Sequence, residues 1–253
     1  MATTSPSRSE RIAHLCSVVA LFMRDHVLSR VSHDLRSPLN AIHSWAYVLE
    51  RKIDSADPAA QRAIDGIRTG VEQQVQLLET IVDTTRNETR QLPVAREPFP
   101  ADAMINDAID DARIALADAR GVTIDARGMP CGGTIDGDIE RCGQALWLML
   151  VFAAEASARH ATIALDVAEE ASQIRLAVGF TATMQALTDA AVPHRLEAFA
   201  RTQACQPQET GRAAWVLALC QRVAEAHGGR FEAEPLKDGA PATLTLRLPI
   251  RPA

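Results

Sequence analysis

The segment Ser32-His33-Asp34-Leu35-Arg36-Ser37-Pro38-Leu39-Asn40 lies within a stretch, from about residue 8 to 51, that contains no glycine and only one proline. Apolar residues recur through the second half of this stretch in steps of three and four, which is the spacing of one face of an α-helix. These residues are Leu28, Val31, Leu35, Leu39, Ile42, Ala46 and Leu49. The sequence therefore predicts one long helix with a narrow apolar stripe.

A second helical pattern follows from 58 to about 91. Pro58 suits a first helical turn, Asp57 is a candidate N-cap, and KIDSADP reads as a tight connection between two helices. The second stripe consists of Ile64, Ile67, Val71, Val75, Leu78, Val82 and Thr85. The two helices predict an antiparallel hairpin that cannot cover its own stripes, so we expect a homodimer in which two hairpins form a four-helix bundle.

His33 is the most informative residue of the first helix. At ~100° per residue it lies about 160° around the helix from Leu35, so it points away from the apolar stripe. Asp34 can orient the imidazole or take its proton, and Ser37 places a hydroxyl one turn further on the same face. Pro38 removes the amide that would bond the carbonyl of Asp34, so a bend is expected there. An exposed, oriented imidazole on a rigid helix suits nucleophilic chemistry.

The segment QLPVAREPFP, residues 91–100, contains three prolines and reads as an interdomain linker over 93–100. Beyond it, helices are expected near 101–119, 138–158 and 211–227, the last capped by Gly228 and Gly229. Strands are expected near 122–126, 161–167, 173–178, 230–234 and 242–248. The predicted fold class is α+β, with a helical hairpin over 1–92 and an α/β sandwich over 101–253.

Composition excludes several classes of protein. The chain of 253 residues is 47% hydrophobic, which is globular, and no uninterrupted apolar run approaches the ~18 residues of a membrane helix. The five cysteines are scattered and include no CxxC pair, so neither a disulfide framework nor a zinc site is expected. The net charge of −6 lies after residue 95, and no basic face indicates nucleic-acid binding. We expect a cytoplasmic protein without a membrane segment or a secretory signal.

The segment SHDLRSPLNAI resembles the H-box of bacterial sensor histidine kinases almost letter for letter. The resemblance implies that His33 is the phosphoacceptor. It also implies that Asp34 is the adjacent acid that assists phosphoryl transfer, and that Ser37 helps to orient a hydrolytic water. The helical hairpin corresponds to the dimerisation and phosphotransfer domain of that family.

The second domain resembles the ATPase domain of the same kinases. EAHGGRFEAEPLKDGAPATLTLRLPI, residues 225–250, is similar to the end of that domain, and 136–157 is similar to its asparagine-bearing helix. Leu148 and Phe152 occupy the two asparagine positions. Magnesium requires oxygen ligands, which neither side chain has.

The other nucleotide-binding motifs of the family also depart from its pattern. In the DxGxG stretch, Val178 stands at the aspartate and Phe180 and Ala182 at the glycines. In the GxGxG turn, the glycine positions hold Arg212, Ala214 and Val216, and Trp215 lies between the last two. The backbone freedom that forms a phosphate cradle is lost there. We therefore expect no nucleotide, metal or other cofactor in this chain, with the apolar replacements filling the former site; a repurposed ligand pocket is the alternative.

Three functions are compatible with the sequence. In the first, the chain is a kinase-derived histidine phosphotransferase of a phosphorelay. Its His33 takes a phosphoryl group from one receiver domain, such as that of a hybrid kinase, and passes it to a response regulator, with magnesium held by the receiver. The receiver would dock near His33, Leu35 and Leu39. In the second, the chain is a soluble histidine kinase with a divergent ATP site. In the third, it is a non-catalytic adaptor that binds response regulators.

Overall fold

The computed structural model describes residues 7–52, 57–89, 92–128, 134–170, 172–206 and 213–251. The chain divides into two compact units. One comprises residues 24–91, and the other comprises residues 1–23 together with 92–253. Each unit is described by itself.

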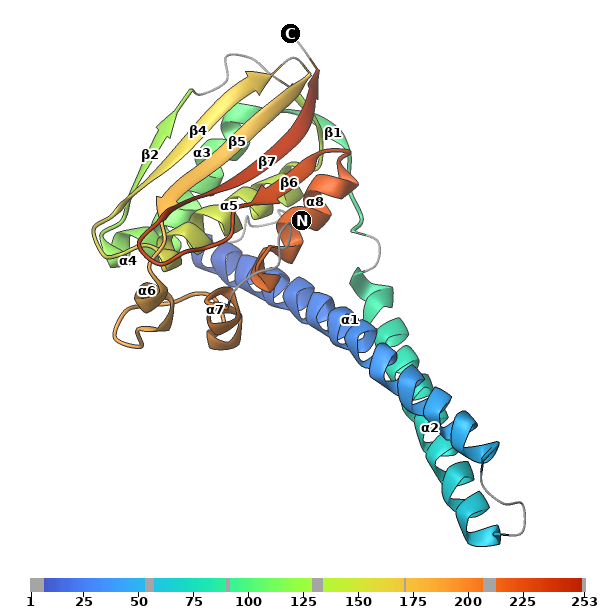
Figure 1. The fold of residues 1–253 in the computed structure, drawn as a ribbon. Helices are drawn as coiled ribbons and strands as arrows, with labels where there is room; N and C mark the ends of the chain where they lie inside the picture. The colour runs from blue at the N-terminus through green and yellow to red at the C-terminus, as the bar shows by residue number, and fades with distance from the viewer. Residues whose placement is uncertain are drawn as a thin grey trace. The chain divides into compact units, whose positions relative to one another are not determined.

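The unit of residues 24–91 is a hairpin of two helices, α1 (Arg8–Glu50) from residue 24 onward and α2 (Pro58–Thr89) (Figure 1). The Asp57 side chain caps α2 by accepting hydrogen bonds from the backbone amides of residues 59 and 60. Ion pairs join the two helices: Arg36 to Glu79 at 3.3 Å and Arg68 to Glu50 at 3.1 Å. The predicted hairpin and its cap are confirmed, although residues 53–56 of the connection lie outside the described residues.

The apolar stripes of this hairpin are only partly covered within one chain. Ala46, Ile64 and Val71 are buried. Large apolar side chains on both helices are exposed: Leu28, Val31, Leu35, Ile42, Leu49, Ile67 and Leu77. A helical hairpin with this much exposed apolar surface offers a face to another molecule.

The larger unit is built on a mixed sheet of seven strands among the residues described. The strands are β1 (Glu97–Pro100), β2 (Thr123–Arg127), β3 (Thr134–Gly137), β4 (Thr162–Glu170), β5 (Gln173–Thr181), β6 (Arg230–Ala233) and β7 (Pro241–Arg251). Their order is β1-β3-β7-β5-β4-β2, and β6 also pairs with β7. Only β2 and β4 are parallel among these pairs. The predicted hairpin of 161–167 and 173–178 is β4–β5.

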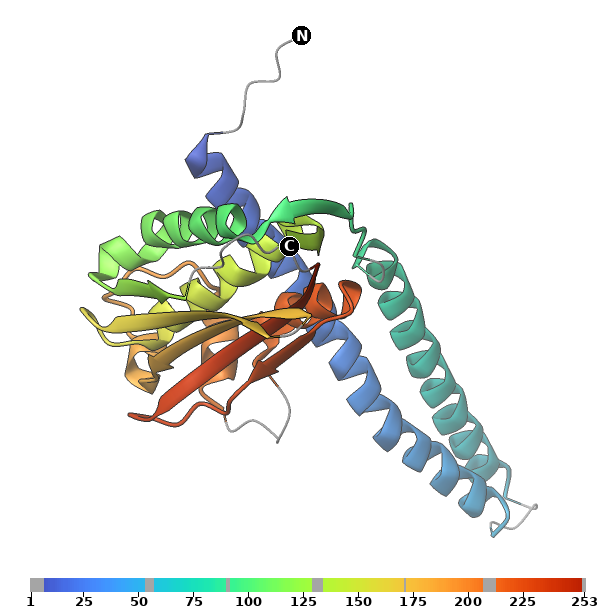
Figure 2. The same cartoon turned by 90° about the horizontal axis from the view of Figure 1, so that it is seen from above.

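Helices cover one face of this sheet (Figure 2). The described helices of this unit after α1 are α3 (Ala101–Ala112), α4 (Asp118–Arg120), α5 (Ile139–Ala156), α6 (Met184–Thr188), α7 (Ala198–Ala204) and α8 (Ala218–Ala226). A π-helical turn, Arg113–Ala117, joins α3 to α4, and a 3-10 turn, Trp215–Leu217, precedes α8. Helix α5 is buried along almost its whole length, so it forms the centre of the core. The architecture is the α+β fold expected from the sequence.

Three parts of this unit differ from the sequence-based expectation. The last four residues of the predicted linker form β1, which pairs antiparallel with the unexpected strand β3. Pro98 and Pro100 are tolerated in β1 because an edge strand needs only some of its amides for pairing. The expected helix over 211–227 begins only at Trp215 with a 3-10 turn, and residues 211 and 212 lie outside the described part of the chain.

The first turns of α1 belong to the α/β unit. Ile12, Leu15 and Val19 are buried there. The two arginines that precede them, Arg8 and Arg11, form ion pairs with Asp111 of α3. An 18-residue window of α1 has a mean hydropathy of 1.3, so this helix is long and apolar enough, by composition alone, to cross a membrane. Core helices of soluble proteins share this property, and a third of the window is buried within the protein.

Candidate functional site

His33 projects from the exposed face of α1. Its side chain is 80% exposed, and Nδ1 lies 3.2 Å from Oδ1 of Asp34. The other carboxylate oxygen of Asp34 accepts a hydrogen bond of 3.2 Å from Nε of Arg30, one turn earlier on the helix. The carboxylate is therefore held between a guanidinium and the imidazole.

This arrangement distinguishes the two ring nitrogens of His33. When Nδ1 carries the ring proton and donates a hydrogen bond to Asp34, Nε2 presents an unshared electron pair to solvent. An exposed Nε2 beside an oriented carboxylate can act as a nucleophile toward phosphorus. The structure thus brings His33 and Asp34 together, as their positions in the sequence predict.

Ser37 is the third residue singled out by sequence. It is exposed one turn beyond His33, and among the described residues no hydrogen bond joins its hydroxyl to the imidazole. Helix α1 continues through Pro38 as one helix to Glu50. Ser37 therefore shares a face with His33 without a hydrogen bond to it among the described residues.

The second region of interest lies at the positions where the resembled ATPase domain binds its nucleotide. Leu148 and Phe152, on α5, are fully buried. Phe152 packs edge-on against Phe180 of β5, with ring centroids 6.3 Å apart and an interplanar angle of 87°. This geometry is the favourable T-shaped contact of two aromatic rings. The two positions that the resemblance aligns with polar or glycine residues therefore hold apolar side chains in contact with each other.

Four of the remaining replacements are also apolar and buried. Val178, Ala182, Ala214 and Val216 are all buried. Trp215 packs against Phe199 of α7 at 5.5 Å between ring centroids, while Arg212 lies outside the described residues. None of these side chains supplies an oxygen ligand for magnesium or an acceptor for an adenine amino group, so they do not fit Mg–ATP. Among the described residues no group of three or more His, Cys, Asp and Glu side chains could hold a metal ion.

A buried polar cluster next to these positions was not predicted from the sequence. Glu155, on α5, is fully buried, and its Oε1 accepts hydrogen bonds of 2.6 and 2.8 Å from the backbone amides of Arg195 and Leu196. Its Oε2 lies 2.8 Å from Nδ1 of His194 and 3.6 Å from Nε of Arg201. The only sequence signal was an acidic residue in the apolar C-terminal half of α5.

His227, in the HGG turn, is a second buried polar residue. Its Nδ1 donates to the carbonyl of Val223 at 2.7 Å, and its Nε2 accepts from the backbone amide of Asp138 at 2.9 Å. It therefore ties the end of α8 to the start of α5. The neighbouring thiol of Cys142 lies 3.6 Å from Nε2, and burial raises the pKa of this thiol to about 12, so the pair is not a nucleophile–base dyad.

The helical hairpin matches the family of the His Kinase A (phospho-acceptor) domain over residues 23–90. Over almost its whole length the chain is similar to a histidine kinase from Burkholderia phymatum STM815. The crystal structure of that protein matches with 47% sequence identity and a TM-score of 0.79, over 96% of this chain and 99% of that chain. A comparison with curated proteins found no significant match.

More distant matches include two further kinases. The mycobacterial sensor histidine kinase MprB shares 15% identity over 63% of this chain and all of that one, with a TM-score of 0.46. The Acinetobacter baumannii histidine kinase AdeS shares 14% identity over 87% of this chain and 98% of that one, with a TM-score of 0.44. Neither match carries weight in the assignment. The phospho-acceptor hairpin and the near full-length match at 47% identity show that this chain belongs to the histidine kinase family.

Proposed function

We propose that this member of the family works as a dimeric histidine phosphotransferase. His33 would accept a phosphoryl group from the aspartyl-phosphate of one receiver domain and pass it to the aspartate of another, without binding ATP. The observation that carries this proposal is the contact between Phe152 and Phe180. The resemblance aligns these two positions with a metal-binding asparagine and with a glycine, and neither aromatic side chain can take over those roles.

The chemistry needs only groups that the hairpin and a receiver supply. Nε2 of His33 attacks the phosphorus in line, and the bond between phosphorus and the receiver's aspartate oxygen breaks as the N–P bond forms. Positive charge that develops on the imidazole is neutralised by Asp34, which accepts the hydrogen bond from Nδ1. Magnesium would be held by the receiver, and the reverse sequence passes the group to a second receiver.

The exposed apolar stripe supports a dimer as the working form. Leu28, Val31, Leu35, Ile42 and Leu49 repeat at helical spacing along α1 and are more than a third exposed in the single chain. A four-helix bundle of two hairpins would cover them and leave His33 outside. The proposed function also places the chain in the cytoplasm, and burial of Ile12, Leu15 and Val19 within the α/β unit is consistent with that, because it leaves these side chains unavailable to a membrane.

A second candidate is an ATP-dependent histidine kinase with an altered nucleotide site. It is favoured by one observation: the solved protein from Burkholderia phymatum, 47% identical to this chain, is described as a histidine kinase. The two functions differ in the source of the phosphoryl group, so they can be separated by the donor alone.

The first experiment offers ATP as the donor. Purified full-length protein is incubated with γ-labelled ATP and magnesium, and the labelled protein is measured over an hour beside an active histidine kinase. The phosphotransferase predicts no label above the level of the His33→Gln variant. Stoichiometric labelling that depends on His33 would establish the kinase instead.

The second experiment offers receiver domains as donors. A panel of receivers, each labelled by phosphorylation with labelled acetyl phosphate, is mixed with the protein. We expect label to move to this chain from at least one receiver, and His33→Gln should abolish the transfer. His43→Gln is the matched control, because His43 lies on the same helix, is partly exposed and contacts Glu72 rather than Asp34.

A further inference from the structure

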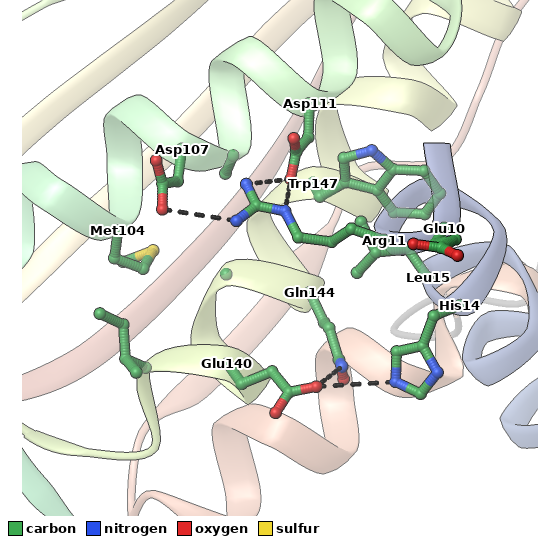
Figure 3. Close-up of a pocket in the computed structure, with 13 residues that line it drawn as sticks. Glu10, Arg11, His14, Leu15, Met104, Asp107, Asp111, Glu140, Gln144 and Trp147 are labelled. Atoms are coloured by element: carbon green, nitrogen blue, oxygen red, sulfur yellow. Dashed lines mark hydrogen bonds and ion pairs between the residues drawn. The ribbon is translucent and has the colours of Figure 1, made fainter. Parts of the chain in front are cut away.

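A cavity of about 610 Å³ lies within the α/β unit, between the first turns of α1 and helices α3 and α5 (Figure 3). This volume falls in the range of roughly 300–1,000 Å³ that is usual for small-molecule sites. It does not involve Phe152, Phe180 or His33. The cavity therefore has no part in the function proposed above.

The lining of the cavity is mostly apolar. Leu15 of α1, Met104 and Ala108 of α3, and Ile139 and Trp147 of α5 contribute to its walls. Trp147 is almost fully buried, and its indole Nε1 has no hydrogen-bond partner in the described part of the chain. A predominantly apolar wall favours a ligand with an apolar body.

The charged residues at the cavity are predominantly acidic. Four carboxylates line it, and the only formally cationic lining residue, Arg11, is already engaged by Asp111 and Asp107. Asp107 is 64% exposed and meets Arg11 only at 3.7 Å, and Glu140 is 67% exposed and meets His14 at 3.6 Å. Figure 3 shows Asp107 on α3 and Glu140 on α5, where Glu140 also accepts a hydrogen bond of 3.1 Å from Nε2 of Gln144. Each retains capacity for a further cation.

We propose that this cavity binds a small organic cation with an apolar body, such as an aromatic or alkyl ammonium compound. The body would lie against the apolar wall, where Ile139 is 46% exposed. The ammonium group would reach Asp107 or Glu140, whose negative charge favours a cation. A neutral ligand would lose this attraction, and an anion would be repelled by the acidic rim.

The glycine at position 143 provides a way to close the cavity without touching its charges. It lies on α5 in the lining, and a Cβ at this position would meet only Cγ of Met104, at 3.8 Å. The backbone therefore accepts a side chain there, and a larger one such as leucine would occupy the ligand's space.

The test uses three probes with the same phenylethyl body and different charge: 2-phenylethylammonium, 2-phenylethanol and 3-phenylpropionate. The full-length protein is labelled with ¹⁵N at tryptophan, which gives indole signals for Trp45, Trp147 and Trp215. The signals are assigned with Trp45→Phe and Trp215→Phe. We expect the cation to shift the Trp147 signal saturably, with an affinity about tenfold higher than that of the alcohol, and we expect the anion to bind most weakly.

Two sets of variants connect the signal to the cavity. Gly143→Leu should abolish the shift. Asp107→Asn combined with Glu140→Gln should remove the preference for the cation while leaving binding of the alcohol unchanged. Asp102→Asn is the matched control, because Asp102 lies on α3 but not in the lining, and this variant should behave as the parent protein.

Each alternative outcome decides against the proposal. It is overturned if none of the probes shifts the Trp147 signal, if the alcohol or the anion binds as tightly as the cation, or if the charge variants leave the preference intact. Unchanged binding to a folded Gly143→Leu variant would also overturn it. If that variant disturbs the spectrum without a probe, the charge variants decide alone. None of these results depends on whether His33 receives a phosphoryl group.

Discussion

Glu155 and His194 form a buried contact between α5 and the segment that precedes α7, with Oε2 and Nδ1 2.8 Å apart. The same carboxylate accepts two backbone amides from that segment, so one side chain fixes the path of residues 194–196. Arg120 adds a further connection, because its guanidinium donates to the backbone carbonyls of Glu155 and Ala186. The polar cluster organises a segment that lacks strands and long helices.

Replacing Glu155 by alanine should destabilise the protein strongly. The change leaves the backbone amides of Arg195 and Leu196 without their acceptor and removes the charge that pairs with Arg201, which typically costs about 3–5 kcal/mol. Urea unfolding followed by circular dichroism measures the loss. Glu79→Ala is the control, since its pair with Arg36 is exposed and should cost less than about 1 kcal/mol. A loss below that level for Glu155→Ala would contradict the role assigned to the carboxylate.

Gly137 and His227 should show strong coupling in a double-mutant cycle. A Cβ on Gly137 would lie 2.5 Å from Cδ2 of His227, which is too close for any real side chain. Gly137→Ala should therefore be costly in the parent protein and much less costly when His227 is replaced by alanine. We expect a coupling energy of about 1–3 kcal/mol from unfolding free energies. Additive effects would show that the clash is relieved in another way.

Asp34→Asn should slow phosphoryl transfer to His33 without preventing the protein from folding. The amide keeps the shape of the carboxylate but cannot neutralise an imidazolium, so we expect a loss of roughly 100-fold in the transfer rate, within the usual contribution of acid–base groups. Rapid-quench kinetics with a phosphorylated receiver measure this rate. Glu79→Gln, which removes a carboxylate from α2, should leave it unchanged. Equal rates for Asp34→Asn and the parent protein would exclude Asp34 from the transfer step.

Cys142 and Cys220 should resist alkylation in the folded protein. Burial raises the pKa of both thiols, that of Cys142 to about 12, so at pH 8 only roughly one Cys142 thiol in 10,000 is ionised. Mass spectrometry after treatment with iodoacetamide should find both unmodified, and both should react once the protein is unfolded in urea. Cys131→Ser removes a thiol that lies outside the described residues and simplifies the spectrum. Modification of Cys142 in the native protein at the rate of an exposed thiol would show that the core opens there.

The parts of the fold that the sequence predicted are those where one local pattern decides the structure. The steps of three and four through Leu35 and Ile64 predicted the two helices of the hairpin, and Asp57 its cap. Alternation in residues 161–178 predicted the β4–β5 hairpin. His33 and Asp34 were found because they are adjacent in sequence and their meeting requires no tertiary structure.

The parts that sequence did not predict depend on distant partners. Strand β1 exists because it pairs with β3, almost 40 residues later, and its prolines alone predict a linker. Ile12 and Leu15 look like any apolar helix residues, and only the packed structure assigns them to the α/β unit. No local pattern around Glu155 indicated that its carboxylate would accept hydrogen bonds from backbone amides 40 residues away.

The edge-to-face stacking of Phe152 and Phe180 also constrains how this chain can change over time. An asparagine introduced at 152 alone would bury an amide against an aromatic ring and leave empty space beside it, while a glycine introduced at 180 alone would leave the other ring unsupported. Each single change therefore lowers the free energy of unfolding, because it leaves the partner ring without its contact. The two positions are coupled through this contact, and we expect substitutions at one to be tolerated only together with a change at the other.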